Sequence, residues 1–168
     1  MKTYDDYPCS TVAVCNAQTL LTYLLGAYLV SFYGALWAVL YIAFCIYLEY
    51  ALLSKSCTNC YYYGKTCAFG RGRISALLFK KGSARKFLQR KFSWTDLLPS
   101  LLASIVPVLA GAFLLFSGFR WDILLAIALL ALLFTVGNNY VRGSLACKFC
   151  KQRKLGCPAE KAFRQAKK

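Results

Sequence analysis

The sequence contains no histidine, and acidic residues are scarce: six against 21 lysines and arginines. Without histidine, histidine-ligated haem and mixed cysteine–histidine zinc sites are excluded. The side chain that most often acts as a general base near neutral pH is missing as well. No pairing of a nucleophile with a base replaces it, so we expect a non-catalytic protein.

Charge of either sign is almost missing from two long stretches. Residues 10–53 contain only Glu49, and residues 97–140 contain only Arg120 and Asp122. An apolar run of about 18 residues is long enough for a helix to cross the roughly 30 Å hydrocarbon core of a bilayer. Neither stretch shows the polar stripe of a helix in a soluble protein. The sequence therefore predicts an all-α integral membrane protein. The four expected membrane spans cover residues 15–32, 35–53, 99–117 and 121–140.

Lysine and arginine are distributed unevenly about these spans. With four spans, both termini and the 54–98 segment lie on one side, which then holds every lysine and arginine except Arg120. The positive-inside rule makes that side cytoplasmic. We expect a multi-pass protein of the cell membrane with both termini in the cytoplasm, where structural disulfides are rare. Glu49, near the cytoplasmic end of the second span, is expected to reach the interface.

One cysteine pattern, Cys-x2-Cys-x6-Cys, occurs twice on the expected cytoplasmic side, at residues 57–67 and 147–157. Each copy follows a pair of spans, so the chain is predicted to consist of two parallel repeats related by an axis along the membrane normal. That symmetry would bring both motifs to equivalent positions at the cytoplasmic face. The predicted division is residues 1–75 for the first repeat, 76–98 for a basic interfacial segment and 99–168 for the second repeat.

Two cysteines spaced C-x-x-C can bind one metal ion or one edge of a cluster. Each motif supplies three thiolates, and Cys9 and Cys15 lie on the same side before the first span. Eight thiolates would make two four-cysteine sites; one shared site, with Cys67 and Cys157 spare, is the alternative. Cys45 falls within a span and is expected to be a packing residue. The predicted ligands are Cys9, Cys15, Cys57, Cys60, Cys67, Cys147, Cys150 and Cys157.

All-cysteine sites suit iron–sulfur clusters or zinc, and the spacing does not decide between them. Paired sites at a membrane face suit electron relay, and the motifs have aromatic and basic flanks that would raise a cluster's potential. We therefore favour iron–sulfur clusters, two of the [4Fe–4S] type, in an electron-transfer or accessory subunit of a larger membrane redox complex. The first alternative is a zinc-stabilised structural or assembly subunit. The second is a membrane dithiol oxidoreductase.

The segment between the first motif and the third span is basic, with apolar residues interleaved. Its expected contact residues are Lys80, Lys81, Arg85, Lys86, Arg90 and Lys91. A short helix over residues 84–93, capped by Ser83, would lie in the interface with its cations on anionic head groups. A basic face also suits an acidic soluble electron carrier. No nucleic-acid-binding module is recognisable, so a nucleic acid partner is not expected.

Overall fold

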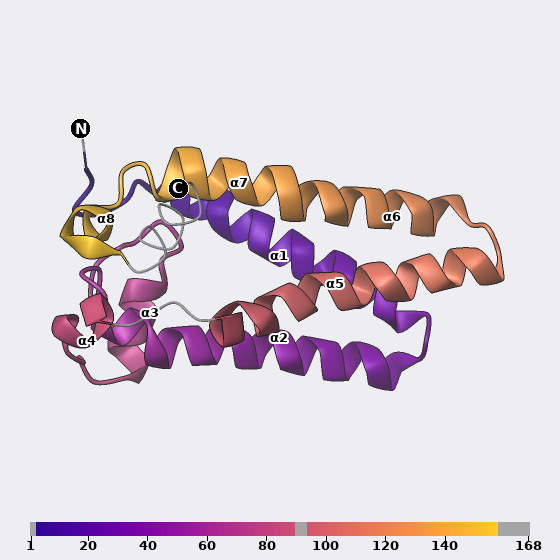
Figure 1. The fold of residues 1–168 in the computed structure, drawn as a ribbon, viewed down its shortest axis with the longest axis horizontal. Helices are drawn as coiled ribbons and strands as arrows, with labels where there is room; N and C mark the ends of the chain where they lie inside the picture. The colour runs from indigo at the N-terminus through magenta and orange to yellow at the C-terminus, as the bar shows by residue number, and fades with distance from the viewer. Residues whose placement is uncertain (1–2, 90–93, 158–168) are drawn as a thin grey trace. The chain divides into compact units, whose positions relative to one another are not determined.

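A computed structural model describes residues 3–89 and 94–157 of the chain (Figure 1). The long helices are α1 (Cys9–Ser31), α2 (Ala35–Lys55), α5 (Trp94–Ser117) and α6 (Trp121–Leu132). The short ones are η1 (Cys57–Asn59), α3 (Arg71–Leu78), α4 (Ala84–Gln89), α7 (Asn138–Tyr140) and α8 (Lys151–Gly156), with π-helical segments at Leu133–Gly137 and Val141–Ala146. Among the described residues the only β pairing is an isolated bridge between Tyr4 and Cys150. The predicted all-α class is confirmed.

Four helical stretches are long and apolar enough to cross a membrane, which confirms a multi-pass membrane protein. They are Cys9–Ser31, Ala35–Asn59, Leu98–Ser117 and Trp121–Ala146. The first begins earlier than predicted, and the second and fourth end later. Helical hydrogen bonding continues through the small and polar residues at the ends of each apolar run, so hydropathy alone underestimates the helix length.

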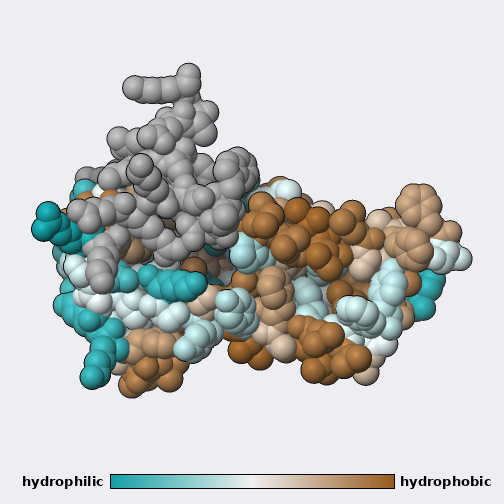
Figure 2. Space-filling model, turned by 60° about the horizontal axis from the view of Figure 1, so that its bottom comes forward, coloured by the Kyte–Doolittle hydropathy of each residue, from teal (hydrophilic) through white to brown (hydrophobic). Residues whose placement is uncertain are grey.

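The long helices expose large hydrophobic side chains. Leu36, Leu109, Phe113 and Leu125 are each more than 60% exposed, and the face in Figure 2 is mostly hydrophobic over the helices. A surface of this kind is unfavourable in water and suited to lipid.

The described structure consists of two compact units. The cysteine unit comprises Met1–Asn16, Glu49–Trp94 and Val141–Lys168, and the helical unit comprises Ala17–Leu48 and Thr95–Tyr140. These units are defined by contact and not by duplication, so the division of the chain into two repeats stays a prediction. Every lysine and arginine except Arg120 falls within the residue ranges of the cysteine unit.

The first helical hairpin of the helical unit turns at residues 31–34, where the predicted spans 15–32 and 35–53 meet. The Tyr33 N–H donates to the Val30 carbonyl at 3.1 Å, and the Gly34 N–H donates to the Ser31 carbonyl at 3.0 Å. Gly34 has a φ of 122°, a conformation that L side chains rarely adopt. Glycine at this position therefore allows α1 to reverse into α2 within a few residues.

Close packing of α1, α5 and α6 forms one core of the helical unit. Leu29, Ile123, Ala126 and Leu130 are buried together there. A Cβ at Gly111 of α5 would lie only 2.8 Å from Cγ1 of Ile127. A small residue at this position therefore lets two membrane helices approach closely, as is common where helices pack in lipid.

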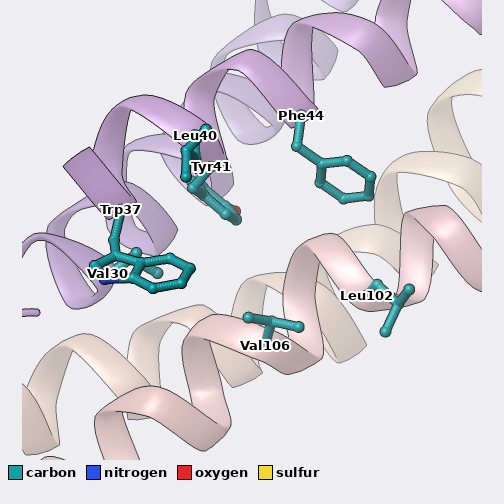
Figure 3. A pocket seen from close by; sticks show the side chains of 7 residues that line it. All are labelled: Val30, Trp37, Leu40, Tyr41, Phe44, Leu102 and Val106. Atoms are coloured by element: carbon teal, nitrogen blue, oxygen red, sulfur yellow. The ribbon is translucent and has the colours of Figure 1, made fainter.

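A second contact in the helical unit compensates for a proline inside α5. Pro107 has no N–H, so the carbonyl four residues earlier, at Ala103, lacks its usual intrahelical donor. The Tyr41 hydroxyl of α2 donates to that carbonyl oxygen at 2.7 Å. Gly26 of α1 makes room for the ring, since a Cβ there would lie 2.2 Å from the Tyr41 hydroxyl oxygen. Figure 3 shows Tyr41 on a hydrophobic groove between α2 and α5.

Candidate functional site

The cysteine unit brings the two cysteine motifs into direct contact. The side-chain oxygen of Gln152, in the second motif, accepts from the Tyr61 N–H of the first at 2.8 Å and contacts the Cys60 sulfur at 3.9 Å. The Lys151 N–H donates to the Tyr62 hydroxyl at 3.0 Å. Two segments about 90 residues apart in the sequence are therefore joined by hydrogen bonds. One bond uses a side chain of the second motif, and the other uses a side chain of the first.

The two C-x-x-C turns have the same backbone hydrogen bonds. In each, the N–H of the second cysteine donates to the carbonyl of the first, Cys60 to Cys57 at 3.2 Å and Cys150 to Cys147 at 3.3 Å. The residue three places further on then donates its N–H to the carbonyl of the second cysteine, at 3.1 Å in the first motif and 3.2 Å in the second. The two C-x-x-C turns thus share these two backbone hydrogen bonds, whereas their helices differ: η1 covers the first turn, and α8 follows the second.

The N-terminal segment before α1 links the two motifs. The Tyr4 N–H donates to the Phe149 carbonyl at 3.1 Å, and the Tyr7 N–H donates to the Thr66 carbonyl at 2.9 Å. The Tyr7 hydroxyl donates to the Ala146 carbonyl at 2.5 Å. One short segment is therefore bonded to the loop of the first motif and to the chain on either side of Cys147.

Asp5 adds an ionic contact to this link. Its carboxylate accepts from Lys151 Nζ at 2.6 Å and from the Tyr61 hydroxyl at 2.6 Å, and it lies 3.8 Å from Lys65 Nζ. The hydrogen bonds from Lys151 and Tyr61 hold the pKa of Asp5 below its ordinary value. Asp5 therefore binds, as a carboxylate, to residues of both motifs.

A small apolar cluster fills the centre of the cysteine unit. Its buried members are Tyr7, Cys15, Tyr62, Ala68, Val141 and Ala146. Cys60, Cys67 and Cys150 pack against it, together with aromatic side chains such as Phe69 and Phe149. Three motif cysteines and one N-terminal cysteine thus border a single water-poor cluster of aromatic rings.

The structure separates the two N-terminal cysteines that the sequence treats alike. Cys15 is completely buried in the apolar cluster, whereas Cys9 is exposed at the first residue of α1. Cys57 and Cys157 are half-buried and Cys147 is exposed. Cys45 is buried in the helical unit with Val30 and Tyr41, as expected for a packing residue.

Burial governs the ionisation of the cysteines at the centre of the unit. Desolvation raises the pKa of Cys60 to about 11, and the neighbouring Cys150, Cys67 and Cys157 act in the same direction. Burial raises the pKa of Cys150 as well. Both side chains are therefore neutral thiols near pH 7 in the metal-free protein, and neither has the lowered pKa of a reactive cysteine nucleophile.

In the described ranges, 3–89 and 94–157, no three cysteine or acidic side chains are close enough together to hold a metal ion. Cys60, Cys67 and Cys150 border the apolar cluster but do not converge on one point. Their chemistry nevertheless fits a soft metal, because the donor set is made of sulfur with no histidine. Metal binding would require thiols to lose protons and side chains to turn, which couples binding to local rearrangement.

Glycines fix the loop of the first motif. The Gly64 N–H donates to the Gly72 carbonyl at 3.0 Å. A Cβ at Gly72 would lie 2.0 Å from the Tyr62 carbonyl oxygen and 2.5 Å from that of Lys65. Sequence reasoning missed Gly72, as well as Gln152 and Asp5, because no motif or period distinguishes these residues.

The predicted basic segment is described in part. Lys80, Lys81 and Arg85 are exposed, and α4 covers Ala84–Gln89 of the helix predicted at residues 84–93. The side chain of Lys86 and the whole of Arg90 and Lys91 lie outside the described residues. Before this segment, an Arg71 Nη atom lies 2.5 Å from a Glu49 carboxylate oxygen. The Glu49 carboxylate thus forms an ion pair with the first residue of α3.

No protein-family model matches the chain, and neither a curated protein nor a solved structure matches it. The class of protein is therefore defined by the fold alone. It is a multi-pass, all-helical membrane protein with a cysteine-rich unit built from the ends of its helices.

Proposed function

We propose that this chain is a metal-binding protein of the cell membrane whose metal centre is of the iron–sulfur type. The main support is the common location of both cysteine motifs and Cys15 around one apolar cluster. Independent thiols used only for packing would have no reason to share a duplicated turn and direct hydrogen bonds. In this proposal the protein is an electron-transfer or accessory subunit of a larger membrane redox complex.

The ligands in this proposal come from both motifs and from α1. They are Cys15, Cys57, Cys60, Cys67, Cys147, Cys150 and Cys157. A bound cluster would supply one-electron transfer. The buried rings of Tyr7 and Tyr62 would exclude water from it. Positive charge from Lys148 and Lys151 would offset the thiolate charge, raise the potential and favour an acidic carrier as partner.

Cys15 rather than Cys9 is the N-terminal ligand in this proposal. The Cys15 side chain is in the cluster that the motif cysteines border, whereas Cys9 is exposed at the start of the same helix. With Cys15 alone, seven thiolates remain. That number favours one complete four-cysteine site shared between the motifs over two separate complete sites.

The cytoplasmic placement of the cysteine unit is part of the same proposal. All lysines and arginines except Arg120 belong to the ranges of this unit, so the positive-inside rule assigns it to the cytoplasm. A reducing compartment would keep the thiols available for metal.

A zinc-stabilised scaffold is the second candidate. The observation that favours it is the bonding of Tyr4, Asp5 and Tyr7 to both motifs, since a closed metal site would lock the same segments together. A dithiol oxidoreductase has less support, because the raised pKa values of Cys60 and Cys150 oppose thiolate formation.

Anaerobic purification of the full chain, followed by iron, sulfide and zinc analysis and a visible spectrum, tests the proposal. Brown protein with iron and sulfide in equal amounts, about four of each per occupied site, is expected. Colourless protein with stoichiometric zinc would replace it with the scaffold function. Folded protein with neither metal would contradict both.

Two pairs of variants identify the ligands. Cys60→Ser should remove most of the metal, whereas Cys45→Ser, which changes a buried cysteine of the helical unit, should leave it in place. Cys15→Ser should lower the metal content, and Cys9→Ser should not. Equal effects of the last two variants would contradict the assignment of Cys15.

A further inference from the structure

Helix α3 packs beside the end of the second membrane span. The Ser75 hydroxyl donates to the Leu53 carbonyl of α2 at 3.2 Å. The Phe79 ring, just after α3, makes an edge contact with the Tyr50 ring of α2, with centroids 5.4 Å apart. Both α2 residues belong to the last turns before the span ends at Asn59. Helix α3 therefore lies beside the end of a helix that is long and apolar enough to cross a bilayer.

The face of α3 that points away from α2 is apolar. Ile74, Leu77 and Leu78 are 45%, 85% and 63% exposed, while Gly72 and Ser75 on the opposite face are buried. Three large hydrophobic residues exposed on so short a helix are unfavourable in water. The same residues are favourable at the boundary between head groups and acyl chains.

Cations adjoin this apolar face. Arg73, Lys80, Lys81 and Arg85 are exposed, and residues 71–89 contain no aspartate or glutamate. A hydrophobic face with a positively charged edge complements an anionic lipid surface.

We propose that α3 and the residues up to Arg85 form a lipid anchor. Ile74, Leu77 and Leu78 insert among the acyl chains of the bilayer, and Lys80, Lys81 and Arg85 bind the phosphate groups of anionic phospholipids. This function goes beyond metal binding and does not depend on it. Gly72, the second residue of α3, packs against the loop of the first cysteine motif. The anchor therefore also ties that motif to the membrane surface.

The insertion of α3 is testable with the full chain in lipid nanodiscs. Leu77→Trp is made in a background where Trp37, Trp94 and Trp121 are phenylalanine, and the nanodiscs contain phosphatidylcholine with brominated acyl chains. The matched control is Leu155→Trp, which replaces an exposed leucine of α8 in the same unit. Quenching of the Leu77→Trp fluorescence should be about twofold stronger or more, because bromine quenches only tryptophans in the chain region. Equal quenching would overturn the proposal.

The preference for anionic lipid is tested by removing two positive charges either next to α3 or from α8. In nanodiscs that mix phosphatidylglycerol with phosphatidylcholine, the double variant Lys80→Gln/Lys81→Gln should weaken the enrichment of phosphatidylglycerol around the protein roughly tenfold. Arg153→Gln/Lys154→Gln removes the same charge from α8 and should have little effect. Equal loss in both variants would indicate a general charge effect and contradict the anchor.

A measurement on the unaltered protein guards against misfolded variants. Amide hydrogen exchange of residues 74–81 should be slower in nanodiscs with phosphatidylglycerol than in pure phosphatidylcholine, whereas residues 151–156 of α8 should exchange at the same rate in both. Unchanged exchange in residues 74–81 would overturn the proposed binding to anionic lipid.

Discussion

The cysteine unit and the helical unit satisfy their backbone polar groups in different ways. In the helical unit, nearly every such group is bonded within its own helix, and side chains meet through apolar clusters such as that of Leu29 and Leu130. In the cysteine unit, loops are bonded to one another across long sequence distances, as between Tyr4 and Phe149. Lipid offers no partner for an open backbone group, whereas irregular loops outside it can be satisfied by side chains and water.

One tyrosine in each unit illustrates how differently the two units satisfy backbone carbonyl groups. In the helical unit, the Tyr41 hydroxyl covers one helix carbonyl, at Ala103, that a proline left without a donor. In the cysteine unit, the Tyr62 hydroxyl donates to the Tyr4 carbonyl at 2.7 Å and accepts from the Lys151 N–H. The first repairs one element, while the second joins three segments. The cysteine unit should therefore be the more sensitive of the two to single changes.

The largest effect is expected from Gly72→Ala. The new methyl group would meet two backbone oxygens, at 2.0 Å and 2.5 Å, that cannot move without displacing the loop of the first motif. We expect a loss of about 3 kcal/mol in the stability of the cysteine unit, at the upper end for overpacking. Amide hydrogen exchange of Tyr7 and Gly64, whose N–H groups bond across this unit, measures the loss.

The matched change in the helical unit is Gly137→Ala. Its Cβ would come no closer than 3.5 Å to a neighbouring atom, Nε2 of Gln18, which is an ordinary contact. Alanine favours a helix over glycine, so we expect this variant to be neutral or slightly stabilising. If Gly137→Ala destabilised its unit as much as Gly72→Ala destabilises the other, the two units would not differ in the way described.

The next largest effect is expected in the helical unit, from loss of the hydrogen bond between the Tyr41 hydroxyl and the Ala103 carbonyl. Tyr41→Phe should cost about 2 kcal/mol, because the buried Ala103 carbonyl would lose the donor that the Tyr41 hydroxyl supplies. Pro107→Ala restores an N–H four residues after Ala103, so the double variant should recover most of the loss. Unfolding of the single and double variants in one detergent measures the coupling. Strictly additive effects would show that the hydroxyl does not compensate for the proline.

Hydropathy predicted the helical unit well and the cysteine unit hardly at all. Spans and the turn at residues 31–34 follow from composition summed over many residues, which tolerates errors at the ends. Contacts such as Gln152 with Cys60 depend on which distant segments meet, and no local period encodes that. The separation of Cys9 from Cys15 also escaped prediction, because the first helix was expected to begin at residue 15. Once it begins at Cys9, six residues of helix turn the two thiols to different faces.

The smallest expected effect concerns Asp5 and depends on pH. Because the folded state lowers its pKa, Asp5 contributes stability above its ordinary value of 3.8, and this contribution is lost as the pH falls below that value. Its carboxylate is largely exposed, so solvent screens the ion pair and the contribution is small.

Asp5→Asn should lower the melting temperature of the cysteine unit slightly near neutral pH, and the difference from the unaltered protein should vanish in acid. Near-ultraviolet circular dichroism, which sums the tyrosines of both units, follows the melting, and amide hydrogen exchange of Tyr7 assigns the change to the cysteine unit. Asp122→Asn, which breaks an ion pair with Arg120 in the helical unit, is the control and should leave that melting temperature unchanged. A difference between Asp5→Asn and the unaltered protein that persisted in acid would assign the effect of Asp5 to chain geometry and not to its charge.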